Sequence, residues 1–418
     1  MSSTRAKVAG TGTVMTLLVI AYTLNFIDRQ IIGILAEPIK TDLGLTDTEL
    51  GWLGGTAFAL FYTVLAIPIA RRADRSDRSV ILTAGLALWS LATAACGMAQ
   101  NFVQLFLARM TVGIGEAAGV APAYSLLTDL FPPERRARAM ALFSLGIPLG
   151  SALGVVFGGL IAAKVDWRMA FIVIGVAGVL FAPIYKMGVR DPGHGHAGAP
   201  PVPIGQVFAI IARKPAFWLM SFAAGTGSLI SYGLAFWTPS FLARSFGIDL
   251  VERSLIFGAI QLVGGVAGVW LGGVMGDRLK QSRPGAYALV PMVTYGLCLP
   301  AYLIAFSSQS IALASILFVI PVALSLAWLG PVIGAVTGLV EPRLRATASA
   351  MFLFINNLIG LGLGALVIGL ISDALSGRFG EESLRYSAMV TVTLYLVSAI
   401  LMALAASRLE KDSDSATI

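Results

Sequence analysis

Twelve apolar runs, each long enough to cross a bilayer as a helix, follow one another along the chain of 418 residues. A membrane-spanning helix needs about 20 apolar residues. Only 12% of the residues are charged, which is about half the share that soluble domains carry. The sequence therefore predicts an all-α polytopic membrane protein with twelve transmembrane helices. The expected spans are 14–36, 48–70, 79–99, 102–130, 138–163, 169–189, 215–241, 253–275, 286–305, 310–338, 346–374 and 386–407.

Lys and Arg are distributed unequally between the two sets of loops. With the N-terminus inside, the cytoplasmic segments hold twenty of the 29 Lys and Arg residues, the outer loops hold seven, and the spans hold two. Basic residues gather in cytoplasmic loops, so we expect both termini in the cytoplasm. The net charge of +7 then reflects topology and contact with membrane lipid headgroups, and no nucleic-acid partner is expected.

The chain contains an internal repeat. Asp74-Arg75, after the second span, reappears as Asp277-Arg278 after the eighth, and the segment 132–161 is echoed by 342–371. Such repeats are typical of transporters built from two related halves. The expected parts are an N-terminal six-helix bundle 1–189, a cytoplasmic linker 190–214 with an interfacial helix at 204–212, a C-terminal six-helix bundle 215–407 and a cytoplasmic tail 408–418.

Glycine recurs at every fourth position in two spans, beginning at Gly146 in the fifth and at Gly264 in the eighth. On a helix, such a stripe lets a neighbouring backbone approach closely. The stripes predict either static packing surfaces or a seam along which the two bundles slide.

Ionisable residues in the middle of spans carry the most information about function. Asn25, Asp28 and Arg29 share one face of the first span, and Arg109 and Glu116 share one face of the fourth. A charge at membrane depth costs about 2.5–3.5 kcal/mol even on the most lenient scale. These residues either join two helices as neutralising pairs or line a pathway, and intramembrane ionisable groups usually do the latter.

The second half has no ionisable residue deep in a span, so a central cavity is expected to be charged on one side and mostly apolar on the other. Its candidate substrate-binding residues are Tyr232, Trp237, Asn356 and Asn357, beside Asn25, Arg29 and Arg109 of the first half. Each of the four is also a candidate for an ordinary interhelical hydrogen bond or interfacial contact. The paired acidic and basic loops predict a conformational latch at the cytoplasmic helix ends, formed by Asp74, Arg75, Arg78, Asp277 and Arg278.

The inventory of reactive residues argues against an enzyme. Cys96 and Cys298 lie in apolar runs, and the two histidines, His194 and His196, lie in a Gly- and Pro-rich loop. No metal site, cofactor or nucleophile–base pair is therefore expected within the membrane.

The motifs resemble those of a known family. Two six-span halves and paired Asp-Arg loops resemble the major facilitator superfamily, as does Arg109-x-x-x-Gly113-x-Gly115. Within it, the segments 25–29, 108–117 and 167–171 resemble the Spinster family. The resemblance implies a proton-coupled carrier of lysophospholipids or sphingoid phosphates that acts as a monomer, and the compact loops suggest a relative in a bacterial cytoplasmic membrane.

The expected mechanism is alternating access around a midplane cavity. In this mechanism, Asp28 and Glu116 bind protons. Arg29 and Arg109 adjust the pKa values of these carboxyl groups and hold an anionic headgroup. Three alternatives stay open: a proton-coupled transporter of an amphipathic drug or small organic anion, an uncoupled facilitator, and a membrane sensor.

Overall fold

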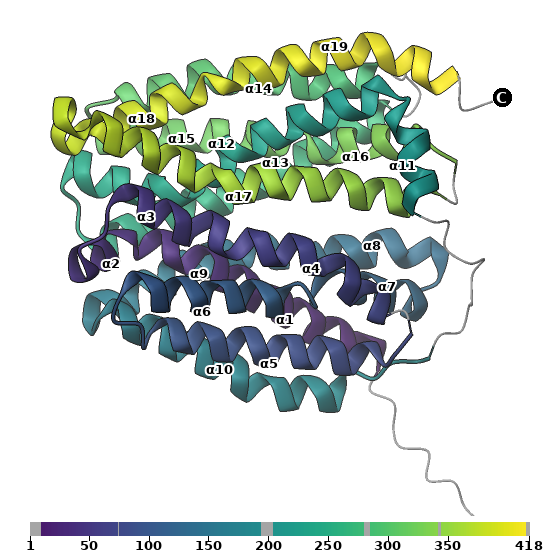
Figure 1. Ribbon diagram of the computed structural model, residues 1–418, viewed down its shortest axis with the longest axis horizontal. Coiled ribbons are helices and arrows are strands. Elements are labelled where there is room, and N and C mark those ends of the chain that lie inside the picture. The colour runs from purple at the N-terminus through teal and green to yellow at the C-terminus, as the bar shows by residue number, and fades with distance from the viewer. Residues whose placement is uncertain (1–9, 74, 194–203, 280–284, 342–343, 415–418) are drawn as a thin grey trace, which may run out of the picture. The chain divides into compact units, whose positions relative to one another are not determined.

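The computed structural model describes residues 10–73, 75–193, 204–279, 285–341 and 344–414, and these residues form helices joined by short connections (Figure 1). The histidines His194 and His196 and the latch residue Asp74 lie outside the described residues. The chain divides into two compact units.

Unit 1 consists of residues 1–44 and 57–197. It takes in most of the first half of the sequence. Its helices are α1 (Thr11–Ile34), α2 (Ala36–Leu43), α4 (Ala57–Ala73), α5 (Arg78–Cys96), α6 (Phe102–Glu116), α7 (Val120–Leu130), α8 (Pro133–Ser144), α9 (Gly146–Lys164) and α10 (Trp167–Gly188).

Unit 2 consists of residues 45–56 and 198–418. The start of the second span thus packs with helices that come much later in the chain. The elements are α3 (Asp47–Gly51), the π-helix η1 (Trp52–Thr56), α11 (Ile204–Ala212), α12 (Pro215–Phe246), α13 (Leu250–Leu279), α14 (Ala286–Ser307), α15 (Ile311–Leu326), α16 (Leu329–Gly338), α17 (Arg345–Phe379), the 3₁₀ turn η3 (Gly380–Glu382), α18 (Ser383–Val392) and α19 (Leu394–Asp414).

The same pairing of spans occurs in both units. In unit 1, α1 packs on α9, α5 on α10, and α4 on α6; in unit 2, α12 packs on α17, α14 on α19, and α13 on α15. These are the first and fifth, third and sixth, and second and fourth spans of each half. The pairing is the structural counterpart of the repeat seen in the sequence.

Side-chain caps start several spans where the sequence predicts a boundary. The carboxylate of Asp77 accepts from the backbone amides of Ser79 and Val80 at the start of α5. Asn101 and Asp166 accept from the third residue beyond them at the starts of α6 and α10. Such oxygens satisfy amides that have no partner within the helix.

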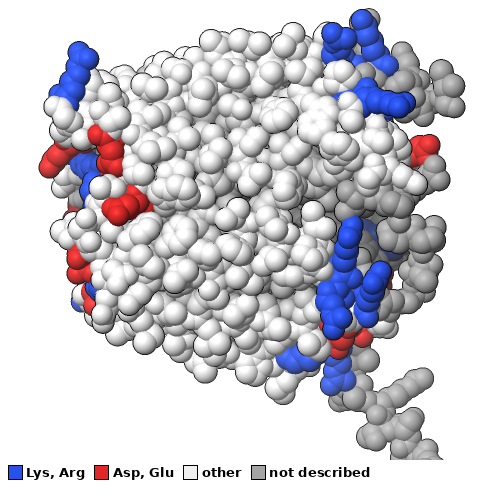
Figure 2. Space-filling view, in the orientation of Figure 1, with Lys and Arg blue, Asp and Glu red and all other residues white. Residues whose placement is uncertain are grey.

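Ten helical stretches among the described residues are long and apolar enough to cross a membrane. The last, Thr347–Leu409, contains two spans because the chain turns at Gly380, whose φ is 56°. The predicted fourth span is interrupted between α6 and α7, so neither piece reaches span length alone. On the face shown in Figure 2, the surface between the charged helix ends is uncharged. Large apolar side chains such as Leu91, Trp270 and Ile316 are exposed, as on a surface that a bilayer covers.

The glycine stripes are packing surfaces inside the units. A Cβ on Gly150 would lie 2.4 Å from the carbonyl oxygen of Thr23, so α9 can approach α1 only because this position is glycine. A Cβ on Gly268 would lie 2.5 Å from the carbonyl oxygen of Ala323, next to α15. Both stripes pack helices of a single unit, which favours the static interpretation.

Candidate functional site

The five mid-span polar residues of the first half come together inside unit 1. Asn25, Asp28, Arg109 and Glu116 are each at most 2% exposed, and the Arg29 side chain is 11% exposed. The first span supplies three of them and the fourth supplies two, as the shared helix faces predict. We call this group the charged cluster.

An ion pair joins the two helices of the charged cluster. Arg29 Nε donates to Glu116 Oε2 across 2.7 Å. Arg109 Nη1 donates to the backbone carbonyl oxygen of Asp28 across 3.2 Å, so Asp28 and Arg109 lie at one level. Both contacts run between α1 and α6. Arg29 therefore forms an ion pair with Glu116, a residue 87 positions further along the chain.

Three aromatic rings surround the Arg29 guanidinium. Its central carbon lies 5.0 Å from the ring centre of Phe26, 4.8 Å from that of Phe58 and 4.5 Å from that of Tyr62. An aromatic face attracts a cation and removes it from water, with an energy of about 0.5–2 kcal/mol per contact. The sequence analysis missed these residues, although Phe58 and Tyr62 stand at i and i+4 of α4.

Several polar atoms of the charged cluster have no hydrogen-bond partner among the residues that the structure describes. They are Asn25 Oδ1, Asp28 Oδ1, Arg109 Nε and Glu116 Oε1. Buried polar atoms are nearly always bonded in native proteins, so a concentration of exceptions needs an explanation such as water, an exchangeable proton or a ligand. The cluster has the chemistry to take up protons and to bind an anion.

Two of the four candidate substrate residues of the second half, Trp237 and Asn356, form hydrogen bonds between helices. Trp237 Nε1 donates to the carbonyl oxygen of Ala365 across 2.8 Å, and Asn356 Oδ1 accepts from Ser228 Oγ across 2.8 Å. These bonds join α12 to α17. Tyr232 and Asn357 are half-buried.

The candidate latch residues are partly described. Arg78 is buried and binds Asp191 across 2.6 Å, Asp129 across 2.5 Å and Ser125 across 2.9 Å, all within unit 1. Its observed role is to fix the residues that follow α10. Arg75 and Arg278 are exposed, and the side chain of Asp277 lies outside the described set. The latch stays a prediction.

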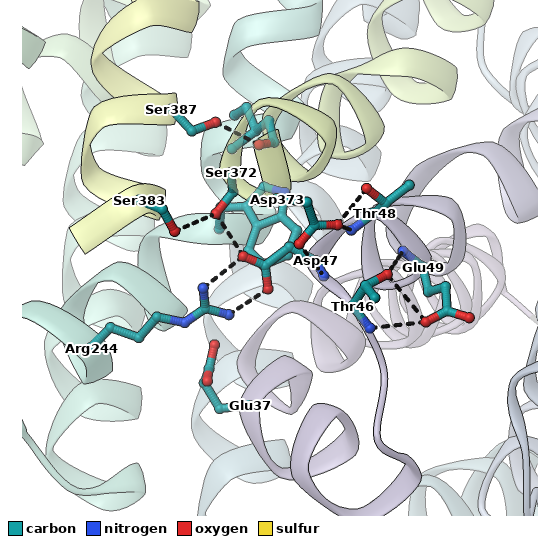
Figure 3. Close-up of polar contacts among 12 residues, drawn as sticks. Glu37, Thr46, Asp47, Thr48, Glu49, Arg244, Ser372, Asp373, Ser383 and Ser387 are labelled. Atoms are coloured by element: carbon teal, nitrogen blue, oxygen red, sulfur yellow. Dashed lines mark hydrogen bonds and ion pairs between the residues drawn. The ribbon is translucent and has the colours of Figure 1, made fainter. Parts of the chain in front are cut away.

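A second polar group, missed by the sequence analysis, lies in unit 2 (Figure 3). Both carboxylate oxygens of Asp47 accept from Arg244, each across 2.7 Å, and Ser372 Oγ donates to Asp47 across 2.7 Å. Asp373 accepts from the backbone amides of Asp47 and Thr48, at 3.1 and 2.7 Å. We call these residues the Asp47 network. The network ties the first turn of the second span to α12 and α17.

The sequence carries one readable signal for this place. Thr46 and Glu49 form a capping box, with each side chain bonded to the backbone amide of the other. The motif marks the helix start. It does not identify Arg244 or Asp373 as partners, because these lie about two hundred and three hundred residues away along the chain.

The helical fold with a buried charged cluster defines a multi-pass membrane transporter. A family model described as the Major Facilitator Superfamily matches residues 18–365, and the chain belongs to this superfamily, among the Spinster proteins. The family is one of transporters and not of enzymes.

The relatives include bacterial and animal proteins. The chain is 34% identical to an MFS-type efflux pump of Mycolicibacterium smegmatis, over 94% of this chain and 92% of the pump. It is 32% identical to human protein spinster homolog 1, over 84% of this chain and 71% of the human protein. It also resembles the crystal structure of a bacterial homologue of the human lysosomal transporter Spinster, inward-facing and unoccupied, with 31% identity, a TM-score of 0.87, and coverage of 96% of this chain and 98% of that one.

Proposed function

We propose that the chain is a proton-coupled secondary transporter that moves an amphipathic, lipid-like substrate, of lysophospholipid or sphingoid type, by alternating access. The observation that carries the proposal is the ion pair between the largely buried Arg29 and the fully buried Glu116. One of its members can lose its charge by taking a proton, and the other can bind an anion in its place.

Proton binding and anion binding are linked through this pair. While Glu116 is ionised, its carboxylate occupies Arg29 Nε. Protonation of Glu116 weakens that bond, because a neutral carboxyl group attracts a guanidinium far less than a carboxylate does. The Nε of Arg29 can then bind an anionic headgroup in place of the Glu116 carboxylate. Asp28, which is buried and belongs to the same helix as Arg29, is the second proposed proton site.

The surroundings of Arg29 suit an amphipathic molecule. A guanidinium binds a phosphate through two parallel hydrogen bonds, and the rings of Phe26, Phe58 and Tyr62 offer apolar surface beside it. Arg109, which also lies near Phe58, is the second proposed headgroup ligand. Tyr232 and Asn357 remain proposed substrate contacts of the second half, together with the ring of Trp237 and the amide of Asn356.

A proteoliposome experiment tests the proposal. We expect uptake of labelled lysophospholipid to accelerate when a pH gradient is applied. The variant Glu116→Gln is expected to lose this dependence, while the exposed carboxylate variant Glu381→Gln keeps it. If wild-type uptake does not change when the pH gradient is applied, the proposed proton coupling is wrong. If no lysophospholipid is taken up at all, the proposed substrate class is wrong.

One observation favours a second cargo. The relative in Mycolicibacterium smegmatis is described as an efflux pump, so export of an amphipathic drug or organic anion is the second candidate. The same vesicles, loaded with a panel of such compounds, separate the two cargoes. We further propose a monomer in a bacterial cytoplasmic membrane with both termini inside.

A further inference from the structure

A small cavity lies inside unit 1, next to the charged cluster. Its volume is about 20 Å³, and residues of α1, α5, α7, α8 and α10 line it together with Gly119. A water molecule needs about 10–15 Å³ of such volume. The cavity therefore has room for about one water and is too small for a lipid tail.

Two of the lining residues offer polar atoms to such a water. Asn25 Oδ1 is an acceptor and Trp89 Nε1 is a donor, and neither has a hydrogen-bond partner among the described residues. Both residues are at most 3% exposed. Cavities that stay dry are apolar, whereas a buried water needs two to four polar partners. This pair supplies one partner of each kind.

The cavity extends from the charged cluster toward one end of the unit. Asn25, at its inner end, also interacts with Glu116. Leu82 lies four residues after the start of α5, and Tyr185 lies three residues before the end of α10. At 1.5 Å per residue, both are within about 6 Å of those helix ends along the axis. These ends carry Arg78 and Lys186, on the side expected to face the cytoplasm.

We propose that this cavity is a water-binding site through which protons pass between the cytoplasmic side of unit 1 and Glu116, with Asn25 and Trp89 orienting the water. The proposal rests on the proton coupling proposed above. A hydronium ion gives its proton to the Glu116 carboxylate, which becomes a carboxylic acid, and water remains; release is the reverse. Asn25 and Trp89 do not ionise and act as positioning residues.

Other charged and titratable groups lie near this route on several helices, including Tyr124 of α7, whose ring contacts the lining residue Phe143. Asp28 and Arg29 belong to α1, Arg109 to α6, Tyr62 to α4 and Cys96 to α5. Tyr22 and Tyr185 line the cavity itself. Any pH dependence of proton uptake reflects all of these groups together. The tests that follow therefore measure water contact and the rate of proton uptake rather than a pKa alone.

The first test uses the wild-type protein and two matched tryptophans. Hydroxyl radicals produced by X-ray radiolysis of water oxidise buried side chains that touch an internal water. Trp89 is 3% exposed with Nε1 unbonded among the described residues, while Trp237 is 1% exposed with Nε1 bonded to Ala365. We expect Trp89 to be oxidised several-fold faster than Trp237. Equal protection of the two rings would overturn the water site.

The second test fills the cavity. Ala123→Leu adds volume at a lining position, and Ala152→Leu adds the same volume at a buried position of α9 outside the lining. Proton uptake after a pH jump, followed with a pH-sensitive dye on purified protein, should slow several-fold in Ala123→Leu and keep its rate in Ala152→Leu. If Ala123→Leu does not fold, the rate of proton uptake is measured in Trp89→Phe instead. This variant removes the N–H donor and keeps an aromatic ring, and its proton uptake should also be slower than that of the wild type.

The outcomes separate this proposal from the proposed function. A wild-type protein that takes up no proton contradicts the coupling itself. A wild type that takes up protons at a rate unchanged by Ala123→Leu or Trp89→Phe keeps the coupling and removes the cavity from the route.

Discussion

Arg29 Nε and Glu116 Oε2 lie 2.7 Å apart and join the first span to the fourth, although 87 residues separate them in the sequence. Glu116 is fully buried, Arg29 is largely buried, and aromatic rings lie against the arginine. This one contact combines a proton acceptor with an anion ligand, and the first two predictions follow from it.

Lower pH should tighten the binding of an anionic lysophospholipid. Protonation of Glu116 releases Arg29, so affinity should rise by up to about tenfold per pH unit while the carboxyl group titrates. In Glu116→Gln the affinity should be high and independent of pH. Calorimetric titrations at several pH values measure this, with Glu381→Gln as the control. A Glu116→Gln protein that keeps the wild-type pH dependence would place the proton elsewhere, with Asp28→Asn as the next variant to measure.

Arg29→Lys should weaken headgroup binding although the charge is kept. An ammonium cannot form the paired hydrogen bonds of a guanidinium or stack flat on the surrounding rings. We expect a loss of about tenfold in affinity, which corresponds to about 1.4 kcal/mol. Arg109→Lys should act in the same direction, and Arg213→Lys, at an exposed position, should have no effect. Equal affinities in all four proteins would leave the arginines as partners of the carboxylates only.

The Asp47 network should hold the first turn of the second span in place. Asp47→Asn takes the Asp47 carboxylate away from the largely buried Arg244 guanidinium, and breaking a buried ion pair costs about 3–5 kcal/mol. Thermal unfolding in detergent should show a clear loss. Adding Arg244→Gln should restore part of it, because the two changes together remove both charges of the Asp47–Arg244 ion pair. Strictly additive effects of the two changes would mean that the pair contributes no coupling energy.

Asp373 should protect two particular amides from hydrogen exchange. It accepts from the backbone N–H groups of Asp47 and Thr48, which begin a helix and therefore lack partners within it. Asp373→Asn should raise the exchange rate of α3, while the amides of α5, capped by Asp77, keep theirs. Unchanged exchange in α3 would show that these bonds add nothing to its local stability.

Acid should release the segment that follows α10. Partial burial acts to raise the pKa of Asp191, but the hydrogen bonds from the side chain and backbone of Arg78 and from Gly193 outweigh it and lower the pKa from 3.8 to about 2. A carboxyl group with a depressed pKa contributes stability that is complete above its unfolded pKa and is lost as the pH falls through the folded one. Proteolysis after residue 188 should therefore increase between pH 4 and pH 2.

The matching variant removes that transition. Asp191→Asn should be more sensitive to protease already at neutral pH and should show no further change in the acid range. An acid-stable protease is the appropriate probe, with cleavage in the loop before α6 as the internal reference. If the acid transition is still seen in Asp191→Asn, another carboxylate is responsible for it. Asp129 is the first candidate, because it also binds Arg78.

The sequence by itself determined the spans, the repeat and the presence of the charged cluster. Apolar length and helix periodicity are local properties, and in a bilayer the backbone must satisfy its hydrogen bonds within each helix. Asp28 and Arg29 therefore lie on one face of α1 whatever else the chain does, and the capping residues Asp77 and Asn101 mark helix starts from their own short surroundings. The interfacial position of 204–212 and the cytoplasmic latch remain predictions.

The tertiary structure alone decided which of these groups meet. Arg29 forms an ion pair with Glu116, 87 residues away along the chain, because the packing of α6 against α1 sets the distances between side chains. The contact of Phe58 with Arg29, the contact of Arg244 with Asp47 and the cavity beside Trp89 are each formed by segments that are distant in the sequence. No local sequence pattern encodes such contacts. A charge buried at membrane depth must find its partner in three dimensions, and so the sequence shows that a partner exists while the fold determines which residue it is.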